Sequence, residues 1–419
     1  MSSHLRRATT AALSILLVGV AATVLTATAT ANANARPTSV AIRATVGALP
    51  LPERLPLPLL AHLPFSPTME VRPAAAPVQL TGKGGVVDTA YTYEGRRSTV
   101  QDFLKRSSTA AFIVLRDDQI LGEQYFSGYN ARSLFNSWSV GKTVTATAVG
   151  IALDEGRIAS LDDPVTKYVP ELKGTGYGNV SVRNVVRMSS GNDWSERNAD
   201  YFNPTTGIVK ASIRMGLGTP MTTLAKETKA AFPPGGKFNY DSMNSYVLAW
   251  VLERATGRPM ASYLEEKLWK PAGMADTMKF GRDYQGNPLG YCCYFATARD
   301  FARFGLLYAR EGQAHGRQVV PASWVRDSTR PSAPQFAPGR LYPGEPDAPE
   351  NAFGYGYGWW LGDGDRGDHL AIGILGEFVY VSPRDRTVIL KISEDLNSGN
   401  HEGESLAAFR AIADEIARS

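Results

Sequence analysis

Short runs of apolar residues, separated by polar turns, mark both ends of the main part of this chain as β-structure. Residues 111–115 and 120–126 flank the acidic pair Asp117-Asp118, a pattern that predicts a β-hairpin with a tight polar turn. Further apolar runs near the C-terminus predict four strands, at 357–361, 370–375, 378–381 and 388–392. Helical spacing over 406–416 predicts a final helix.

The middle of the chain has a different pattern, with apolar residues spaced as in helices. A helix is expected from Ser139 to the stop signal Asp154-Glu155-Gly156. Further helices are expected near 181–188, 243–256, 260–268 and 298–311. Together these patterns predict an α/β (α+β) fold: an antiparallel sheet built from N- and C-terminal segments and flanked by helices, with a helical insert lobe at about 150–290 and a cleft between the two.

The first 79 residues differ from the rest. Arg6 and Arg7 precede an apolar run over 11–25, and small residues alternate over 31–35, so residues 1–35 are expected to be a secretory signal peptide. An uncleaved membrane anchor is the alternative, which the short, Thr- and Gly-containing apolar run disfavours. Residues 36–79, rich in Pro and Ala, read as an arm or linker before a domain over 80–419. The protein is therefore expected to be secreted or extracytoplasmic, without stable membrane insertion after cleavage.

Composition narrows the function classes. The 419 residues are 43% hydrophobic and 20% charged, which is ordinary globular chemistry, and a net charge of +4 predicts no nucleic-acid partner. His315, His369 and His401 show no ligand spacing, so no metal and no cofactor are expected.

The only cysteines, Cys292 and Cys293, are adjacent. Buried thiols are favoured there over a vicinal disulfide or an intermolecular link.

Ser139 and Lys142 are the first candidates for chemistry. Residues three positions apart on the first turn of a helix lie on one face, so the amine can reach the hydroxyl. A serine needs an adjacent base, and a lysine can serve if burial and a helix N-terminus lower its pKa.

Tyr240 is the candidate for a third group that passes a proton on. It follows the turn Pro233-Pro-Gly-Gly236 and precedes Asp241 and Ser242, either of which can cap the helix expected from 243. The phenol would then lie on a short loop at a helix N-terminus; a packed core tyrosine is the bland alternative. A Ser-His-Asp triad is disfavoured because Ser137 to Gly141 does not match the G-x-S-x-G turn.

Six ordered segments make the chain recognisable, and together they resemble the class C β-lactamase-related serine hydrolases over roughly 85 to 415. This superfamily includes penicillin-binding DD-peptidases, family VIII esterases and 6-aminohexanoate-dimer hydrolase. The segments are Ser139-Val-Gly-Lys142, Pro234–Tyr240, Thr256–Pro259, Lys270–Thr277, Thr297–Leu307 and Gly376–Pro383. Met188–Trp194 and Tyr291–Tyr294 look most like the 6-aminohexanoate-dimer hydrolase branch.

The resemblance implies acylation of Ser139, with Lys142 and Tyr240 managing protons and water releasing the acyl group. It also implies an oxyanion hole from the backbone amides of Ser139 and Ile374. Trp194, Tyr201 and Ser242 are candidates for substrate binding, although the two aromatic residues could equally be core residues.

Two departures from the superfamily pattern affect the expected substrate. Ser242 stands where many members have the Asn of Tyr-x-Asn, and Ala371-Ile372-Gly373 lacks the usual Lys or His of the third motif. Without a cation to hold a carboxylate, we expect a small-molecule ester or amide as substrate rather than a β-lactam or a peptide. A cell-wall D-amino-acid peptidase or carboxypeptidase, a β-lactamase, and a catalytically silent binding domain stay open as alternatives. The sequence does not indicate the oligomeric state.

Overall fold

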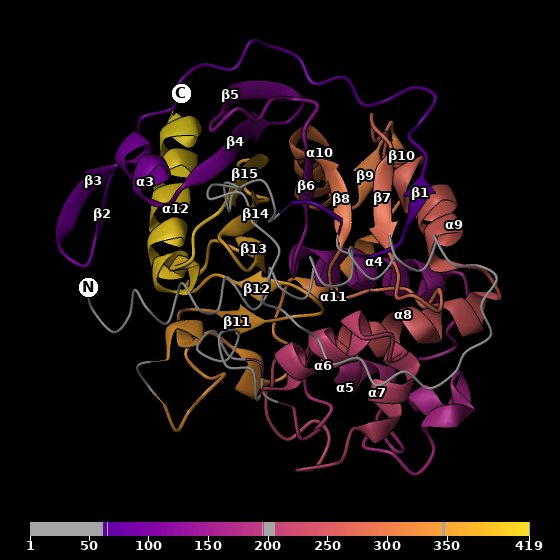
Figure 1. The fold of residues 1–419 in the computed structure, drawn as a ribbon. Helices are drawn as coiled ribbons and strands as arrows, with labels where there is room; N and C mark the ends of the chain where they lie inside the picture. The colour runs from indigo at the N-terminus through magenta and orange to yellow at the C-terminus, as the bar shows by residue number, and fades with distance from the viewer. Residues whose placement is uncertain (1–61, 65, 195, 197–205, 346–347, 419) are drawn as a thin grey trace, which may run out of the picture.

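The largest element of the fold is a seven-stranded antiparallel sheet with the order β11-β12-β13-β14-β15-β4-β5 (Figure 1). The computed structural model describes residues 62–64, 66–194, 196, 206–345 and 348–418. C-terminal strand β15 pairs with β4, so the two ends of the domain share one sheet, as predicted. The strands are β4 (Thr109–Arg116), β5 (Gln119–Tyr125), β11 (Gly354–Tyr355), β12 (Trp360–Leu361), β13 (His369–Gly373), β14 (Glu377–Ser382) and β15 (Thr387–Ser393).

Helices cover both faces of this sheet because its central strands are apolar on both sides. Along β4, Ile113 and Leu115 belong to one buried cluster, and Phe112 and Val114 belong to another. Helix α10 (Ala298–Ala309) packs on the first face, and α3 (Val100–Arg106) and α12 (Glu402–Arg418) pack on the second. The yellow helix α12 runs beside the sheet in Figure 1.

The helical part of the chain lies at the lower right of Figure 1, and two long helices pack together at its centre. In that pair, α4 (Val140–Asp154) packs against α8 (Ser242–Thr256) and also touches β13. The helical segments near 181–188, 243–256, 260–268 and 298–311 are therefore confirmed, with somewhat different ends. The other helices of this part are α5 (Val182–Val186), α6 (Gly207–Gly216), α7 (Met221–Glu227) and α9 (Met260–Leu264), which continues as a π-helical turn over Glu265–Trp269.

A second sheet, of four strands in the order β1-β7-β8-β6, was not predicted. Its strands have three or four residues each, too short for a clear alternation of apolar and polar positions. They are β1 (Thr68–Val71), β6 (Leu134–Asn136), β7 (Met278–Gly281) and β8 (Tyr294–Thr297). Because β1 pairs with β7, the end of the segment read as an arm, residues 68–71, is a strand of this sheet.

The strand predicted over 357–361 is only partly present. Gly358 adopts φ 80°, and a Cβ there would lie 2.7 Å from Cβ of Ala146 on α4. The chain therefore turns at Gly358, and only Trp360–Leu361 pairs in the sheet, as β12. The other predicted strands, the hairpin and the final helix are confirmed.

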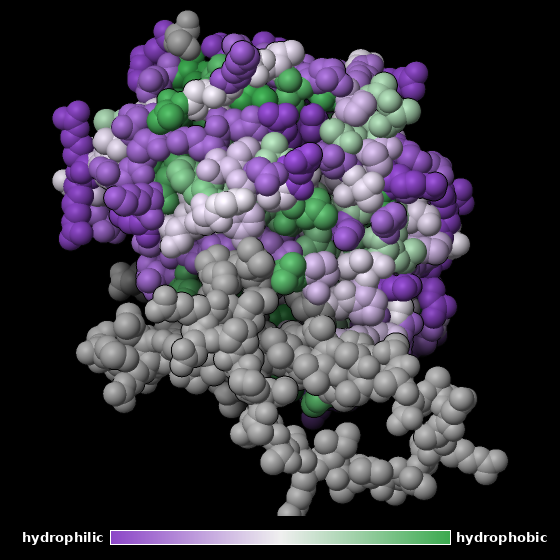
Figure 2. Space-filling model, turned by 45° about the horizontal axis from the view of Figure 1, so that its top comes forward, coloured by the Kyte–Doolittle hydropathy of each residue, from purple (hydrophilic) through white to green (hydrophobic). Residues whose placement is uncertain are grey.

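The surface visible in Figure 2 is mostly hydrophilic, with apolar side chains in small separate patches where grey atoms do not cover it. Within the described residues, none of the helices combines the length and hydrophobicity that a membrane crossing needs. The predicted signal peptide, residues 1–35, and the first part of the arm lie outside the described residues.

Candidate active site

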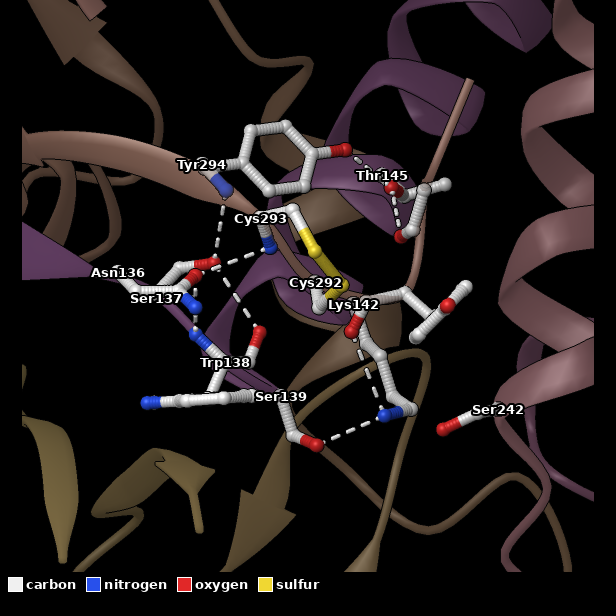
Figure 3. Close-up of a disulfide and its surroundings, with 12 residues drawn as sticks. Asn136, Ser137, Trp138, Ser139, Lys142, Thr145, Ser242, Cys292, Cys293 and Tyr294 are labelled. Carbon is white, nitrogen blue, oxygen red and sulfur yellow. Dashed lines mark hydrogen bonds between the residues drawn. A yellow bond between two sulfur atoms is a disulfide. The ribbon is translucent and has the colours of Figure 1, made fainter. Parts of the chain in front are cut away.

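Ser139 is the N-cap residue of α4. Trp138, the preceding residue, adopts φ 41°, a left-handed conformation that is uncommon for a residue with a side chain. Lys142 Nζ donates a hydrogen bond to Ser139 Oγ at 2.8 Å (Figure 3). The two side chains therefore meet on the first helical turn, as their spacing predicts.

Burial controls the charge of Lys142. Its side chain is 2% exposed, and the loss of hydration lowers its pKa from the ordinary value of 10.5 to about 8. The carboxyl groups of Glu196 and Asp241 act in the opposite direction and favour the ammonium. A fraction of the amine is thus neutral near pH 7, and the neutral form dominates above pH 8.

Tyr240 lies on the loop that leads into α8, two residues before the helix begins. Asp241 is the N-cap of α8 and accepts a hydrogen bond from the backbone amide of Met243 at 2.8 Å. The Lys142 amine lies 4.9 Å from the centre of the Tyr240 ring. Burial raises the pKa of the Tyr240 phenol well above 10, and a hydrogen bond with Ser139 acts against that shift. The phenol is therefore protonated at neutral pH and within reach of the Ser139 hydroxyl.

Glu196 is a member of this cluster that the sequence did not indicate. Its Oε1 lies 3.9 Å from Lys142 Nζ, and both side chains are almost fully buried. The backbone amide of Ser242 donates to Glu196 Oε2 at 2.6 Å, and the Ser242 hydroxyl donates to Oε1. A glutamate in a polar stretch normally predicts solvent exposure, so only its burial beside a lysine reveals the role.

Ser242 and Trp194 both support this carboxylate. Trp194 Nε1 donates to Glu196 Oε2 at 2.7 Å, so the indole contacts the cluster through Glu196. Trp194 lines a neighbouring groove beside α6, with Gly207 and Lys210, rather than the cleft at Ser139. Tyr201, the third predicted substrate-binding residue, lies outside the described residues.

A cleft opens at Ser139 and is bordered by both main parts of the fold. Gly373, at the end of β13, and Ile374, which follows it, line this cleft. A Cβ on Gly373 would lie 3.1 Å from the carbonyl oxygen of Ser137, so a glycine allows this strand end to approach the Ser139 loop. The remaining lining residues are Glu196, Tyr240, Tyr342, Glu350, Trp360, Ile372, Ser398 and Glu402.

Residues 96–413 match the family model described as Beta-lactamase. The chain belongs to the beta-lactamase family. Within it, the chain is 32% identical over 304 residues to 6-aminohexanoate-dimer hydrolase from Paenarthrobacter ureafaciens, covering 71% of this chain and 76% of that protein. Esterase EstB from Burkholderia gladioli is 29% identical over 230 residues, 52% of this chain and 51% of the esterase. With hydrolases as its relatives, this chain is a serine hydrolase.

Solved structures show the same fold. A candidate 6-aminohexanoate-dimer hydrolase from Bacillus anthracis superposes with a TM-score of 0.71 at 24% identity, over 84% of this chain and 92% of that one. The penicillin-binding protein homologue from Pyrococcus abyssi superposes with a TM-score of 0.55 at 19% identity, over 76% of each chain. The predicted fold class and family resemblance are confirmed.

The cysteines of this beta-lactamase family member correct one expectation. Cys292 and Cys293 form a vicinal disulfide, whereas buried thiols were favoured from the sequence. Both residues are buried, at 5% and 0% exposure, so the burial was right and the redox state was wrong. Adjacency alone could not decide the matter, because two sulfurs meet only if the backbone between them takes a suitable conformation.

Titratable groups elsewhere in the described residues do not gather into a metal site. No three His, Cys, Asp or Glu side chains of that part of the chain are placed to hold an ion together.

His62, which belongs to the segment interpreted as an arm, is buried, and its Nδ1 accepts a hydrogen bond from the backbone amide of Asn136 at 3.2 Å.

Proposed function

We propose that this hydrolase cleaves carboxylic esters or small amides through an acyl-enzyme on Ser139. The observation that carries the proposal is the hydrogen bond of 2.8 Å from a buried lysine amine to a serine hydroxyl at the edge of a cleft. A lysine whose pKa lies near 8 can accept a proton without a histidine. The serine hydroxyl then attacks the substrate carbonyl carbon as its proton passes to Lys142.

Tyr240 is proposed to carry a proton between Lys142 and the leaving group. Its high pKa keeps the phenol protonated, so the phenol gives its proton to the departing oxygen or nitrogen and is reprotonated from the Lys142 ammonium. Water then attacks the acyl-enzyme, with the same groups returning the proton to Ser139. Glu196 is proposed to hold the ammonium form of Lys142 in place between these steps.

The backbone amides of Ser139 and Ile374 are proposed to bind the oxygen that becomes negatively charged. Ser139 begins a helix and Ile374 follows β13, and both residues line the cleft. Such fixed donors typically contribute a few kcal/mol each to the stability of the transition state.

The third-motif position favours substrates that need no cation there. Ala371 is fully buried in β13, so this position offers no charge to a substrate carboxylate. Esters and small amides fit this uncharged position better than β-lactams or D-alanyl peptides, and the relatives include a 6-aminohexanoate-dimer hydrolase and an esterase.

Covalent labelling tests the nucleophile. A fluorophosphonate probe is expected to label the wild type at one serine, Ser139, as located by peptide mass spectrometry. Ser139→Ala, shown to be folded by circular dichroism, is expected to take no label. Labelling of another serine, or no labelling of the folded wild type, would falsify the assignment.

Substrate comparison tests the scope. Hydrolysis rates are measured with p-nitrophenyl esters, a 6-aminohexanoate dimer, nitrocefin and a D-alanyl-D-alanine peptide. The ester or the linear amide is expected to have the highest kcat/KM. A dominant rate on the D-alanyl peptide or on nitrocefin would transfer the function to the peptidase or β-lactamase alternative.

Export is proposed on the N-terminal pattern, namely the basic residues, the apolar run and the small residues before Arg36. N-terminal sequencing of the protein recovered outside the cytoplasm is expected to give a start near Arg36. Recovery of the uncut chain with the membrane fraction would favour the anchor.

A further inference from the structure

The Cys292–Cys293 disulfide is linked to both residues of the proposed acyl-transfer pair through its neighbours: Tyr291 contacts Lys142, and Asn136 contacts the loop that precedes Ser139. A bond between neighbouring cysteines closes a small ring around the peptide that joins them, so it restricts the backbone at that point. Cys293 adopts φ 71°, a left-handed conformation that residues with side chains rarely take. In Figure 3 the sulfurs lie between the Asn136–Ser139 loop and Lys142.

On one side of the disulfide ring, the preceding residue contacts Lys142. The carbonyl oxygen of Tyr291, the residue before the ring, accepts a hydrogen bond from Lys142 Nζ at 3.4 Å. The Tyr291 ring centre lies 6.0 Å from the same nitrogen. Both contacts favour the charged form of Lys142, because a carbonyl oxygen and an aromatic face each carry negative charge density.

On the other side the ring contacts the loop that presents Ser139. The backbone amide of Cys293 donates to Asn136 Oδ1 at 3.2 Å, and the amide of Trp138 donates to the same oxygen at 3.2 Å. Asn136 therefore joins the ring to the residue that precedes the nucleophile. The amide of Tyr294 donates to Ser137 Oγ at 3.2 Å, which adds a second link to this loop.

We propose that the Cys292–Cys293 disulfide is a positioning element of this active site and that turnover depends on its oxidised state. The disulfide holds the Tyr291 carbonyl oxygen against the Lys142 amine, and it holds the side-chain oxygen of Asn136 against the backbone amide of Trp138. The proposal rests on the function proposed above for Ser139 and Lys142. Without the ring, Cys293 is free to leave the left-handed conformation, and the contacts on both sides shift. A misplacement of about 1 Å in a reacting group can cost about a hundredfold in rate.

The redox step is a thiol–disulfide exchange. A dithiol reductant gives two electrons and two protons, the S–S bond breaks, two S–H bonds form, and the reductant closes its own disulfide. Oxidation of the two thiols reverses the change. Because the sulfurs are buried, reduction is followed by quenching, unfolding and alkylation of the freed thiols, counted by mass spectrometry.

The first test compares oxidised and dithiothreitol-reduced wild type on a p-nitrophenyl ester. Reduction is expected to lower kcat about tenfold to a hundredfold and to move the rising limb of kcat/KM to lower pH, since Lys142 loses contacts that favour its charged form. Reoxidation is expected to restore both. Unchanged kcat and pH profile in a sample whose alkylation shows two thiols would overturn the proposal, and so would a lower rate with an unmoved pH midpoint.

A matched pair of double variants tests the positioning role of the disulfide without a reductant. Cys292→Ala with Cys293→Ala removes the bond and leaves a residue that disfavours φ 71°, whereas Cys292→Ala with Cys293→Gly removes the bond and keeps that conformation accessible. The Ala/Gly variant is expected to retain several-fold more activity than the Ala/Ala variant, and dithiothreitol should affect neither. Full activity of Ala/Ala would refute the positioning role.

Labelling separates this proposal from the function on which it rests. If the oxidised wild type takes the fluorophosphonate at Ser139 and reduction changes nothing, only the positioning role of the disulfide is lost. If the oxidised protein takes no label at Ser139, the proposed function itself has failed.

Discussion

Two buried lysines in this chain each donate a hydrogen bond to a serine hydroxyl, but the surroundings of the two pairs differ. Lys142 donates to Ser139 at 2.8 Å, and Lys391 donates to Ser393 at 2.5 Å. Burial lowers the pKa of both amines, to about 8 for Lys142 and about 7 for Lys391. By amine chemistry alone, Lys391 would be the better base at neutral pH.

Access and neighbouring groups separate the two pairs. Ser139 lines the cleft and begins a helix beside Tyr240, whereas Ser393 is 0% exposed inside the sheet and meets Thr109. The Lys391 amine lies 5.1 Å from the ring centre of Phe103 and is influenced by the carboxyl groups of Asp395 and Glu377. A lowered lysine pKa therefore does not mark an active site by itself; a reachable nucleophile and a proton relay are also needed.

The largest expected effect comes from removing each amine in turn. Lys142→Met is expected to lower kcat about a thousandfold or more, because Ser139 loses its base. Lys391→Met is the matched control and is expected to keep kcat within about threefold. Steady-state kinetics on a p-nitrophenyl ester measure both. A larger loss in Lys391→Met than in Lys142→Met would reverse the comparison.

Removing the relay tests the second difference between the pairs. Tyr240→Phe keeps the packed ring and is expected to lower kcat about a hundredfold, since the leaving group loses its proton donor. Fluorophosphonate labelling of Ser139 should survive in this variant, because fluoride leaves without a proton. Wild-type turnover by Tyr240→Phe would remove the phenol from the proposed mechanism.

The pH profile sharpens the assignment of Lys142. Its neutral form is the base, so kcat/KM is expected to rise with pH and to level off above about 8. Glu196 favours the ammonium, so Glu196→Gln is expected to move this limb to lower pH by about one unit. Glu377→Gln, which changes a carboxyl group beside Lys391, should leave the limb in place. A limb that Glu196→Gln does not move would separate Glu196 from Lys142.

The smallest expected effect concerns stability. The pKa of Lys391 is lowered from 10.5 in the unfolded chain to about 7 in the fold, so the unfolded state binds more protons between these values. Wild-type stability therefore rises with pH from about 7 to about 10.5 through this group. Lys391→Met lacks this contribution, so its Tm relative to the wild type should increase by a few degrees as the pH falls from 10 to 7. Thermal unfolding by circular dichroism checks the sign.

The sequence by itself determined the local parts of this protein. The three-residue spacing of Ser139 and Lys142 brings them together on any α-helix, and Asp241 caps the helix after Tyr240 as its position indicates. The apolar runs also determined the sheet, in which strands from the two ends of the domain pair, because each strand is buried on at least one face.

The tertiary structure alone decided what depends on residues distant in the chain. The sequence alone predicts a surface position for Glu196, because charged side chains are usually exposed. Only the fold buries this side chain beside Lys142. The short strands of the second sheet gain stability only from their partners. The redox state of Cys292 and Cys293 depends on the backbone conformation at Cys293, which contacts with Asn136 help to hold.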